Sequence, residues 1–117
     1  MKVWYKGEGV KFENSEDCFG ESFGVASAPL DLAVITITAR YPAEGYLYNA
    51  ESDEMAYVVS GVGYLETKNG DRTELSTGSV VHIGTGERIA WCSDNMTLVV
   101  PCAPAFRTEQ HFIEEVK

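Results

Sequence analysis

Short runs rich in β-branched and aromatic residues follow one another along most of the chain, and Gly, Pro, Asn or Asp residues separate them. Runs of this composition and length predict strands. The clearest is LAVITITARY at residues 32–41, in which isoleucine and threonine alternate before Pro42 ends the pattern. About ten such strands with almost no helix predict an all-β chain, folded as a sandwich or a closed barrel, and a double-sheet jelly roll is one such solution.

Two polar dipeptides predict tight hairpins between neighbouring strands. KNGD at 68–71 contains Asn-Gly, which suits the positive φ values of a type I′ turn. Asp94-Asn95 predicts a second hairpin, between strands at 88–93 and 96–101.

The two ends of the chain are less clear. KVWYK at 2–6 predicts a strand that is apolar enough to cover a sheet edge, on the same subunit or on a partner. EQHFIEEV at 109–116 has two interpretations, because Thr108 could cap a helix there while the same residues also alternate as a strand does. His111 in this segment is expected at the surface.

Length and charge exclude several classes of protein. A chain of 117 residues fits one domain, 1–117. It has 9 basic and 18 acidic residues, a net charge of −9 and no basic run. Nucleic acids and anionic membranes are bound through Lys and Arg. We therefore expect no nucleic-acid partner and no membrane partner.

The cysteines and the N-terminal residues predict a cytoplasmic protein. Three cysteines are an odd number without a CxxC pair, which favours reduced thiols over a disulfide framework. Residues 1–18 contain no apolar signal segment, and the longest apolar run, LAVITITA, is too short to span a bilayer.

A glycine frame around Glu54 carries a resemblance to a known family. Glu54 is followed after six residues by Gly61, and GSVVHIGTG runs from Gly78 to Gly86. This frame resembles the two motifs of small single-domain cupins, in the RmlC-like jelly-roll superfamily. The resemblance implies a double-stranded β-helix with a site in the mouth of its barrel. It places the barrel core at about 32–106, N-terminal strands in 1–31 and a tail in 107–117.

The metal site of that family is degenerate in this sequence. The family implies a divalent metal held by three histidines and a glutamate, of which only Glu54 is present. The first two histidine positions fall on Leu47 and Asn49, or on Tyr48 and Ala50 with a shorter spacing, and the last falls on Ile89. Transition-metal sites usually need three protein ligands. We therefore expect no metal cofactor of the family type, although weak binding of a hard ion through Glu54 stays open.

A narrower resemblance points the same way. The run YNAESDEMAYVVSG, followed by a second motif poor in histidine, resembles the cupin domains of ethanolamine-utilisation proteins. The metal histidines are largely replaced in those domains too. This likeness implies a metal-poor pocket.

Glu54 is the predicted catalytic residue. A carboxyl inside a barrel is poorly solvated, which raises its pKa, and such a group can transfer protons near neutral pH. The predicted lining is apolar and consists of Leu47, Ala56, Val58, Ile89 and Trp91. Arg40, on the preceding strand, is a candidate ion-pair partner that would satisfy Glu54 instead.

The remaining predicted site residues would bind substrate, and Arg40 is one of them. Asn49 is a candidate to orient a carbonyl, and Tyr46 and Tyr48 could donate hydrogen bonds at the mouth. Trp91 offers a flat apolar face to a ring. His82 lies on a strand that points it either into the barrel or outward.

Three hypotheses for the function follow. The first is a protein that binds a small polar metabolite without a family-type metal, and acts as an isomerase, epimerase or cyclase through Glu54. The second is a binding or assembly module without chemistry. The third is a metal enzyme with atypical ligands, such as Glu54, Asn49, His82 and a tyrosine. A homodimer is the expected assembly, because exposed sheet edges need cover.

Overall fold

The computed structural model describes residues 1–115. Within these residues the chain forms nine strands and one short 3₁₀-helix, which confirms the all-β prediction. In chain order they are β1 (Val10–Ser15), β2 (Cys18–Gly24), β3 (Asp31–Ile37), β4 (Tyr46–Asn49), β5 (Asp53–Thr67), β6 (Arg72–Ser76), β7 (Val80–Ile83), β8 (Ile89–Ala103), η1 (Thr108–Gln110) and β9 (His111–Glu114).

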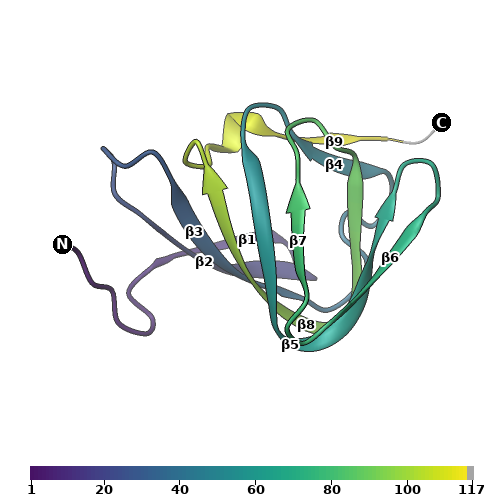
Figure 1. Cartoon of the computed structure of the whole chain (residues 1–117), viewed down its shortest axis with the longest axis horizontal. Coiled ribbons are helices and arrows are strands. Elements are labelled where there is room, and N and C mark those ends of the chain that lie inside the picture. The colour runs from purple at the N-terminus through teal and green to yellow at the C-terminus, as the bar shows by residue number, and fades with distance from the viewer. Residues whose placement is uncertain (116–117) are drawn as a thin grey trace.

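Two long strands organise the sheet. β5 and β8 have 15 residues each and pair antiparallel over almost their whole length. β8 also pairs with β3 and β4, and β5 also pairs with β6 and β7. Both long strands bend, so that the sheet curls into a half-barrel (Figure 1). The element order and the curl are those of a jelly roll.

The polar dipeptide Asp94-Asn95 lies in a bulge, and the predicted hairpin does not form. β8 continues through it, because Asn95 pairs with Val62 and Cys92 pairs with Tyr64, which leaves one extra residue on the β8 side. The hydroxyl of Ser93 donates to the Val62 carbonyl oxygen at 2.6 Å. The extra residue helps the strand to turn from one half of the sheet into the other.

The predicted turn at 68–71 does connect β5 to β6, but it is not of type I′. Gly70 has a φ of +90°, whereas no residue other than glycine has a positive φ among those described. A type I′ turn needs positive φ at both central residues. The Gly70 N–H instead bonds to the Thr67 carbonyl oxygen at 2.8 Å.

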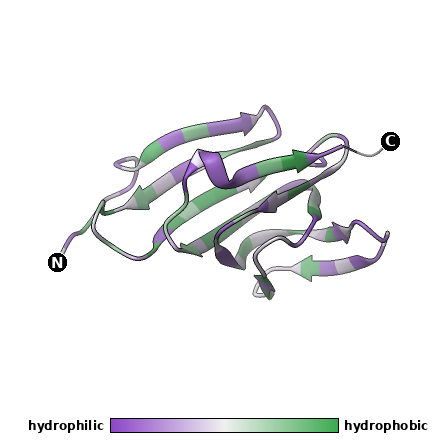
Figure 2. Ribbon diagram, turned by 90° about the horizontal axis from the view of Figure 1, so that it is seen from above, coloured by the Kyte–Doolittle hydropathy of each residue, from purple (hydrophilic) through white to green (hydrophobic). Residues whose placement is uncertain are grey.

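The core fills the concave side of the curled sheet. Figure 2 shows hydrophobic and hydrophilic residues alternating along the strands, as expected where only one face of each strand is buried. The five residues predicted to line the barrel all belong to the core. Its buried members are Cys18, Ile37, Tyr41, Leu47, Ala56, Val58, Leu65, Leu75, Ile83, Ile89, Trp91, Met96, Leu98 and Val100.

Both ends of the chain differ from part of what the sequence predicts. Residues 2–6 form no strand, and the Trp4 ring instead packs edge-on against Phe23 at a centroid distance of 5.9 Å. At the other end the strand interpretation holds, since β9 pairs with β4 along four residue pairs. Val116, the last residue of the alternative helix, lies outside the described residues. No helix within residues 1–115 is long and apolar enough to cross a membrane.

Candidate functional site

Glu54 lies on the concave face of β5. It shares that face with Ala56 and Val58, both buried, because side chains alternate along a strand. Glu54 itself is half-buried. Its carboxyl group makes no hydrogen bond or ion pair with any residue in 1–115. Across the sheet it is opposite Cys102 on β8, which in turn is opposite Asp31 on β3.

This environment shifts the titration of Glu54. Burial and, to a smaller extent, the negative charge of Asp31 raise the pKa of the Glu54 carboxyl to about 7. Arg40, the candidate partner, does not neutralise Glu54, because its guanidinium is 3.2 Å from the carboxylate of Glu66. The ion pair between Arg40 and Glu54, which would have given Glu54 a purely structural role, is therefore absent.

Cys102 and Asp31, which lie in one row across the sheet with Glu54, also have shifted pKa values. Burial raises the pKa of the Cys102 thiol to about 11, so that the thiol stays protonated at neutral pH. Burial also raises the pKa of Asp31, although the Phe106 N–H donates to its carboxylate at 3.1 Å. No motif in the sequence marks Asp31 as a site residue. The alternation that places Ile35 and Ile37 in the core would have placed it on the same face.

Asn49 lies at the end of β4 and is 5% exposed. Its Oδ1 accepts the backbone N–H groups of Glu51 at 2.9 Å and Ser52 at 2.8 Å. Its Nδ2 is buried and has no hydrogen-bond partner within residues 1–115. Leu47 is on the same face of β4 and belongs to the core, so Asn49 points to the concave side.

His111 and Tyr41 are polar residues of the concave side that the sequence did not identify. His111 is opposite Asn49 in the β4–β9 ladder and is half-buried, so the expected surface position is wrong. Its Nε2 is 3.0 Å from the Tyr41 hydroxyl, and the two rings stack. Burial lowers the pKa of His111, while burial and, to a smaller extent, Cys18 raise the pKa of Tyr41 to about 12. Both groups are uncharged at neutral pH.

Tyr46 and Tyr48 do not join Glu54. They alternate with Leu47 and Asn49 on β4 and lie on its other face. The Arg40 guanidinium lies 5.3 Å from the centre of the Tyr46 ring. Tyr48 stacks on Phe112 and is covered by Arg88.

The last two predicted binding residues differ in position. Trp91 is on the concave side and belongs to the core. His82, on β7, has a side chain that is 60% exposed and lies 3.6 Å from Asp53. It alternates with the core residues Val81 and Ile83, and so points outward.

The residues at the family's metal positions do not fit a metal. Leu47 and Ile89 are opposite each other across β4 and β8, both are buried, and neither carries a donor atom. Within residues 1–115 no group of three His, Cys, Asp or Glu side chains could hold a metal ion. The outward position of His82 also removes it from the atypical ligand set considered for a metal enzyme.

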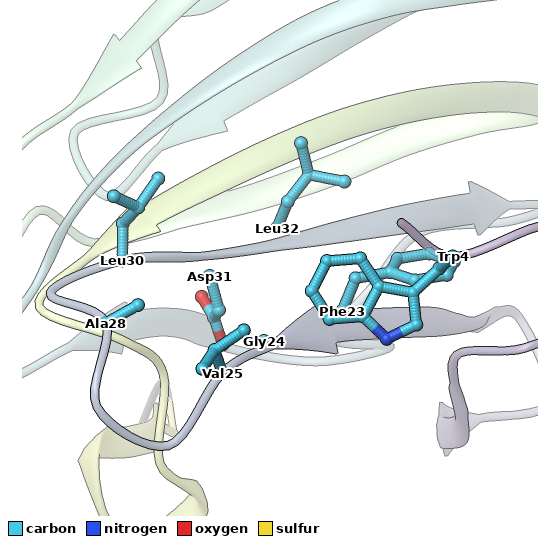
Figure 3. Close-up of a pocket in the computed structure, with 8 residues that line it drawn as sticks. All are labelled: Trp4, Phe23, Gly24, Val25, Ala28, Leu30, Asp31 and Leu32. Carbon is cyan, nitrogen blue, oxygen red and sulfur yellow. The ribbon is translucent and has the colours of Figure 1, made fainter. Parts of the chain in front are cut away.

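Two open grooves are lined by residues other than Glu54. The first, of about 420 Å³, is lined by Trp4, Phe23 and the loop that precedes β3 (Figure 3). In that view the side chains of Asp31 and Leu32 leave β3 on opposite sides. Asp31 lines this groove, and its charge also acts on Glu54. The second groove, of about 500 Å³, lies near the bend of β5 and β8 beside Gly63 and Ser93.

Comparisons with known proteins agree on the fold. No protein-family model matches the chain, and no curated protein matches it in sequence. Among solved structures, Pac13, a nucleoside dehydratase, is 20% identical over 98% of this chain and 92% of its own, with a TM-score of 0.79. Variants of this Streptomyces protein were solved with uridine.

Two further structures are similar. Ectoine synthase from P. lautus is 15% identical over 100% of this chain and 92% of its own, with a TM-score of 0.76. EutQ from Clostridium difficile is 16% identical over 75% of this chain and 63% of its own, with a TM-score of 0.63. All three are cupin-fold proteins. Together with the curled sheet of two long paired strands, they show that this chain has the cupin jelly-roll fold.

Proposed function

We propose that the chain binds a small polar metabolite on the concave side of its sheet and moves a proton on it with Glu54. The observation that carries this proposal is the state of Glu54, a half-buried carboxyl group with a pKa of about 7 and no hydrogen-bonding or ion-pair partner within residues 1–115. A carboxyl group that only stabilises a fold is normally paired. One that is poised between its two protonation states suits general acid–base catalysis.

The reaction class follows from this chemistry. The ionised carboxylate of Glu54 takes a proton from a carbon or oxygen atom of the substrate, and the resulting carboxylic acid returns it at another atom. Isomerisation, epimerisation, cyclisation and elimination of water can all proceed in this way without a redox step. Two proteins of the same fold are a nucleoside dehydratase and a synthase, which supports small-metabolite chemistry on this scaffold.

The proposed chemistry uses the chain's own groups, without a family-type metal. Its support is the apolar pair Leu47 and Ile89 at the family's ligand positions. Elemental analysis of protein purified without added metal tests this part. A stoichiometric transition metal would contradict it.

Exchange of substrate hydrogen with deuterium tests the function of Glu54. The protein is incubated in D₂O with a panel of nucleosides, sugars and oxo acids, and NMR detects deuterium incorporated at carbon. We expect incorporation with wild type and none with Glu54→Gln, which keeps the size of the side chain. Glu13→Gln, on the edge strand β1, removes an exposed carboxylate as the matched control. Unchanged exchange in Glu54→Gln would refute the proposal.

A binding or assembly module without chemistry is the second candidate. The observation that favours it is an apolar convex face on β5 and β7, where Met55, Tyr57 and Val80 are each more than 40% exposed. Such a patch is typical of an interface. A folded protein that exchanges no hydrogen in any compound of the panel, but self-associates through this face, would favour the second candidate.

A further inference from the structure

We propose that Asn49, together with the His111–Tyr41 pair, forms an oxygen-binding subsite on the concave side, which takes the carbonyl or carboxylate oxygen of a small organic ligand. The inference deepens the proposed function by naming the substrate class. It can fail separately, because binding to this subsite does not require a proton transfer by Glu54.

The orientation of the Asn49 amide is fixed by its neighbours. Both partners of Oδ1 are backbone N–H groups, those of Glu51 and Ser52, so an amide flip would place two donors against two donors. The end of the amide that has no partner in residues 1–115 is therefore the NH₂ group, Nδ2. A buried donor without an acceptor lowers the stability of the folded protein. A ligand oxygen that accepts from Nδ2 would recover that stability.

The neighbouring pair offers a second donor. Neutral imidazole carries one N–H and a protonated phenol carries one O–H. The single contact between His111 Nε2 and the Tyr41 hydroxyl uses one of these two hydrogens. The other hydrogen has no side-chain partner within residues 1–115, whichever tautomer is present. Because His111 is opposite Asn49 in the β4–β9 ladder, both donors belong to one face.

Hydrogen bonds hold the segment between this subsite and Glu54 in place. Asn49 binds the backbone of Ser52, whose side chain is buried. The Ser52 hydroxyl lies 2.9 Å from Gln110 Oε1 and 2.7 Å from the Pro104 carbonyl oxygen. Glu54 follows Ser52 by two residues. A ligand held by its oxygen at Asn49 is thus on the same side of the sheet as the unpaired carboxyl group.

Access to Nδ2 requires a small movement, since the atom is sealed from solvent. The residues beside it on β9 belong to the last strand of its half-sheet, which is held by four pairs with β4. Edge segments open at lower free energy than central strands. We therefore expect binding to protect the amide hydrogens of β9 from exchange with solvent.

NMR on ¹⁵N-labelled protein tests the inference, with acetamide, acetate and uridine as probes. The Asn49 side-chain NH₂ signals, identified by their loss in Asn49→Asp, should shift saturably with at least one probe, and the His111 ring signals should shift with the same dissociation constant. If no probe shifts the Asn49 signals, the inference is wrong. It is also wrong if the Asn49 NH₂ group contacts only a bound water when the probe is saturating.

The decisive variant is Asn49→Asp. Its carboxylate keeps both backbone contacts, which also favour the ionised form, but replaces the donor by an acceptor. We expect the dissociation constant of the probe to rise at least about tenfold, because the variant loses one hydrogen bond between the probe and a buried partner. Asn95→Asp makes the same change at an exposed position in the β8 bulge and should bind as wild type does. Equal affinity of Asn49→Asp and wild type overturns the subsite. Probe binding is measured without any exchange of substrate hydrogen, which separates this result from the test of the proposed function.

Discussion

The properties of Glu54 come from its position in one row of the sheet. Glu54 and Asp31 are each opposite Cys102, from two different strands, and all three side chains are on the concave face. Burial disfavours the charged form of Glu54, and the charge of Asp31 adds to this. Arg40 does not offset the two effects, because its guanidinium is engaged by Glu66. A proton therefore leaves Glu54 near neutral pH.

The stability of the protein should depend on pH through Glu54. The pKa of this carboxyl is raised from 4.5 to about 7 on folding, so the folded state holds a proton that the unfolded state has lost between these values. Stability then falls as pH rises through this window, by at most about 3 kcal/mol. Glu54→Gln removes the effect. Urea unfolding should show the variant gaining stability over wild type from pH 4.5 to 7, and no further above it. A difference that does not change with pH would contradict the raised pKa.

Asp31→Asn should lower the pKa of Glu54. The substitution removes the second cause of the shift and keeps the shape of the side chain, while burial, the first cause, stays. Asp53→Asn, beside Glu54 on β5 but exposed, is the control and should leave the pKa unchanged. A carboxyl titration of Glu54 by ¹³C NMR in both variants measures this. If both substitutions changed the pKa of Glu54 equally, the charge of Asp31 would not be a specific cause of its shift.

At the level of strands, the glycine frame marks where the chain bends. Gly61 and Gly78 both have a φ of +92°. A Cβ atom on Gly61 would lie 2.2 Å from the Asn95 carbonyl oxygen, whereas nothing lies within 4 Å of one on Gly78. Gly61 thus allows β5 and β8 to approach closely at their bend. This is a physical reason for glycine at the end of the motif that begins with Glu54.

Substituting these two glycines separates backbone strain from close approach. Gly78→Ala should cost about 1–2 kcal/mol of unfolding free energy, the price of a positive φ. Gly61→Ala should cost more by about 1–3 kcal/mol, because the backbone of β8 must also move. Denaturant unfolding of both variants measures the difference. Equal losses would show that the approach of Asn95 does not matter.

The strands could be predicted from sequence because their pattern is local, whereas their continuity and register could not. Asp94 and Asn95 look like a turn, and only the pairing of β8 with residues of β5 about 30 positions earlier makes them a bulge. The same limit applies to the candidate site. Glu54 and Asn49 were found from a motif, but His111 reaches the concave face only through pairing with β4. Tyr41 became notable only through its contact with His111.

For the whole molecule, the convex face of the half-barrel suggests how two copies could meet. Val34, Val99, Tyr57 and Val80 follow one another across four strands, and Met55 lies beside them on β5. None of these residues is charged. A two-fold contact centred on Tyr57 and Val80 would remove these exposed apolar side chains from water. We therefore propose a two-fold dimer through this face.

The dimer can be tested by light scattering after size-exclusion chromatography. The mass should be about twice the 12.9 kDa of one chain. Tyr57→Lys places a charge in the centre of the patch and should give a monomer. Val62→Lys, farther along β5 and also exposed, should remain dimeric. A monomeric wild type, or a dimer that tolerates Tyr57→Lys, would exclude this interface.

The carboxyl titration of Glu54 in the wild-type protein tests the proposed acid–base function. Protein labelled with ¹³C at the glutamate side-chain carboxyl is followed by NMR from pH 3 to 9, and the Glu54 signal is identified by its loss in Glu54→Gln. The structure predicts a midpoint at about 7. A midpoint near 4.5, the ordinary value for glutamate, would mean that Glu54 is solvated or paired, and would contradict its role as the acid–base group.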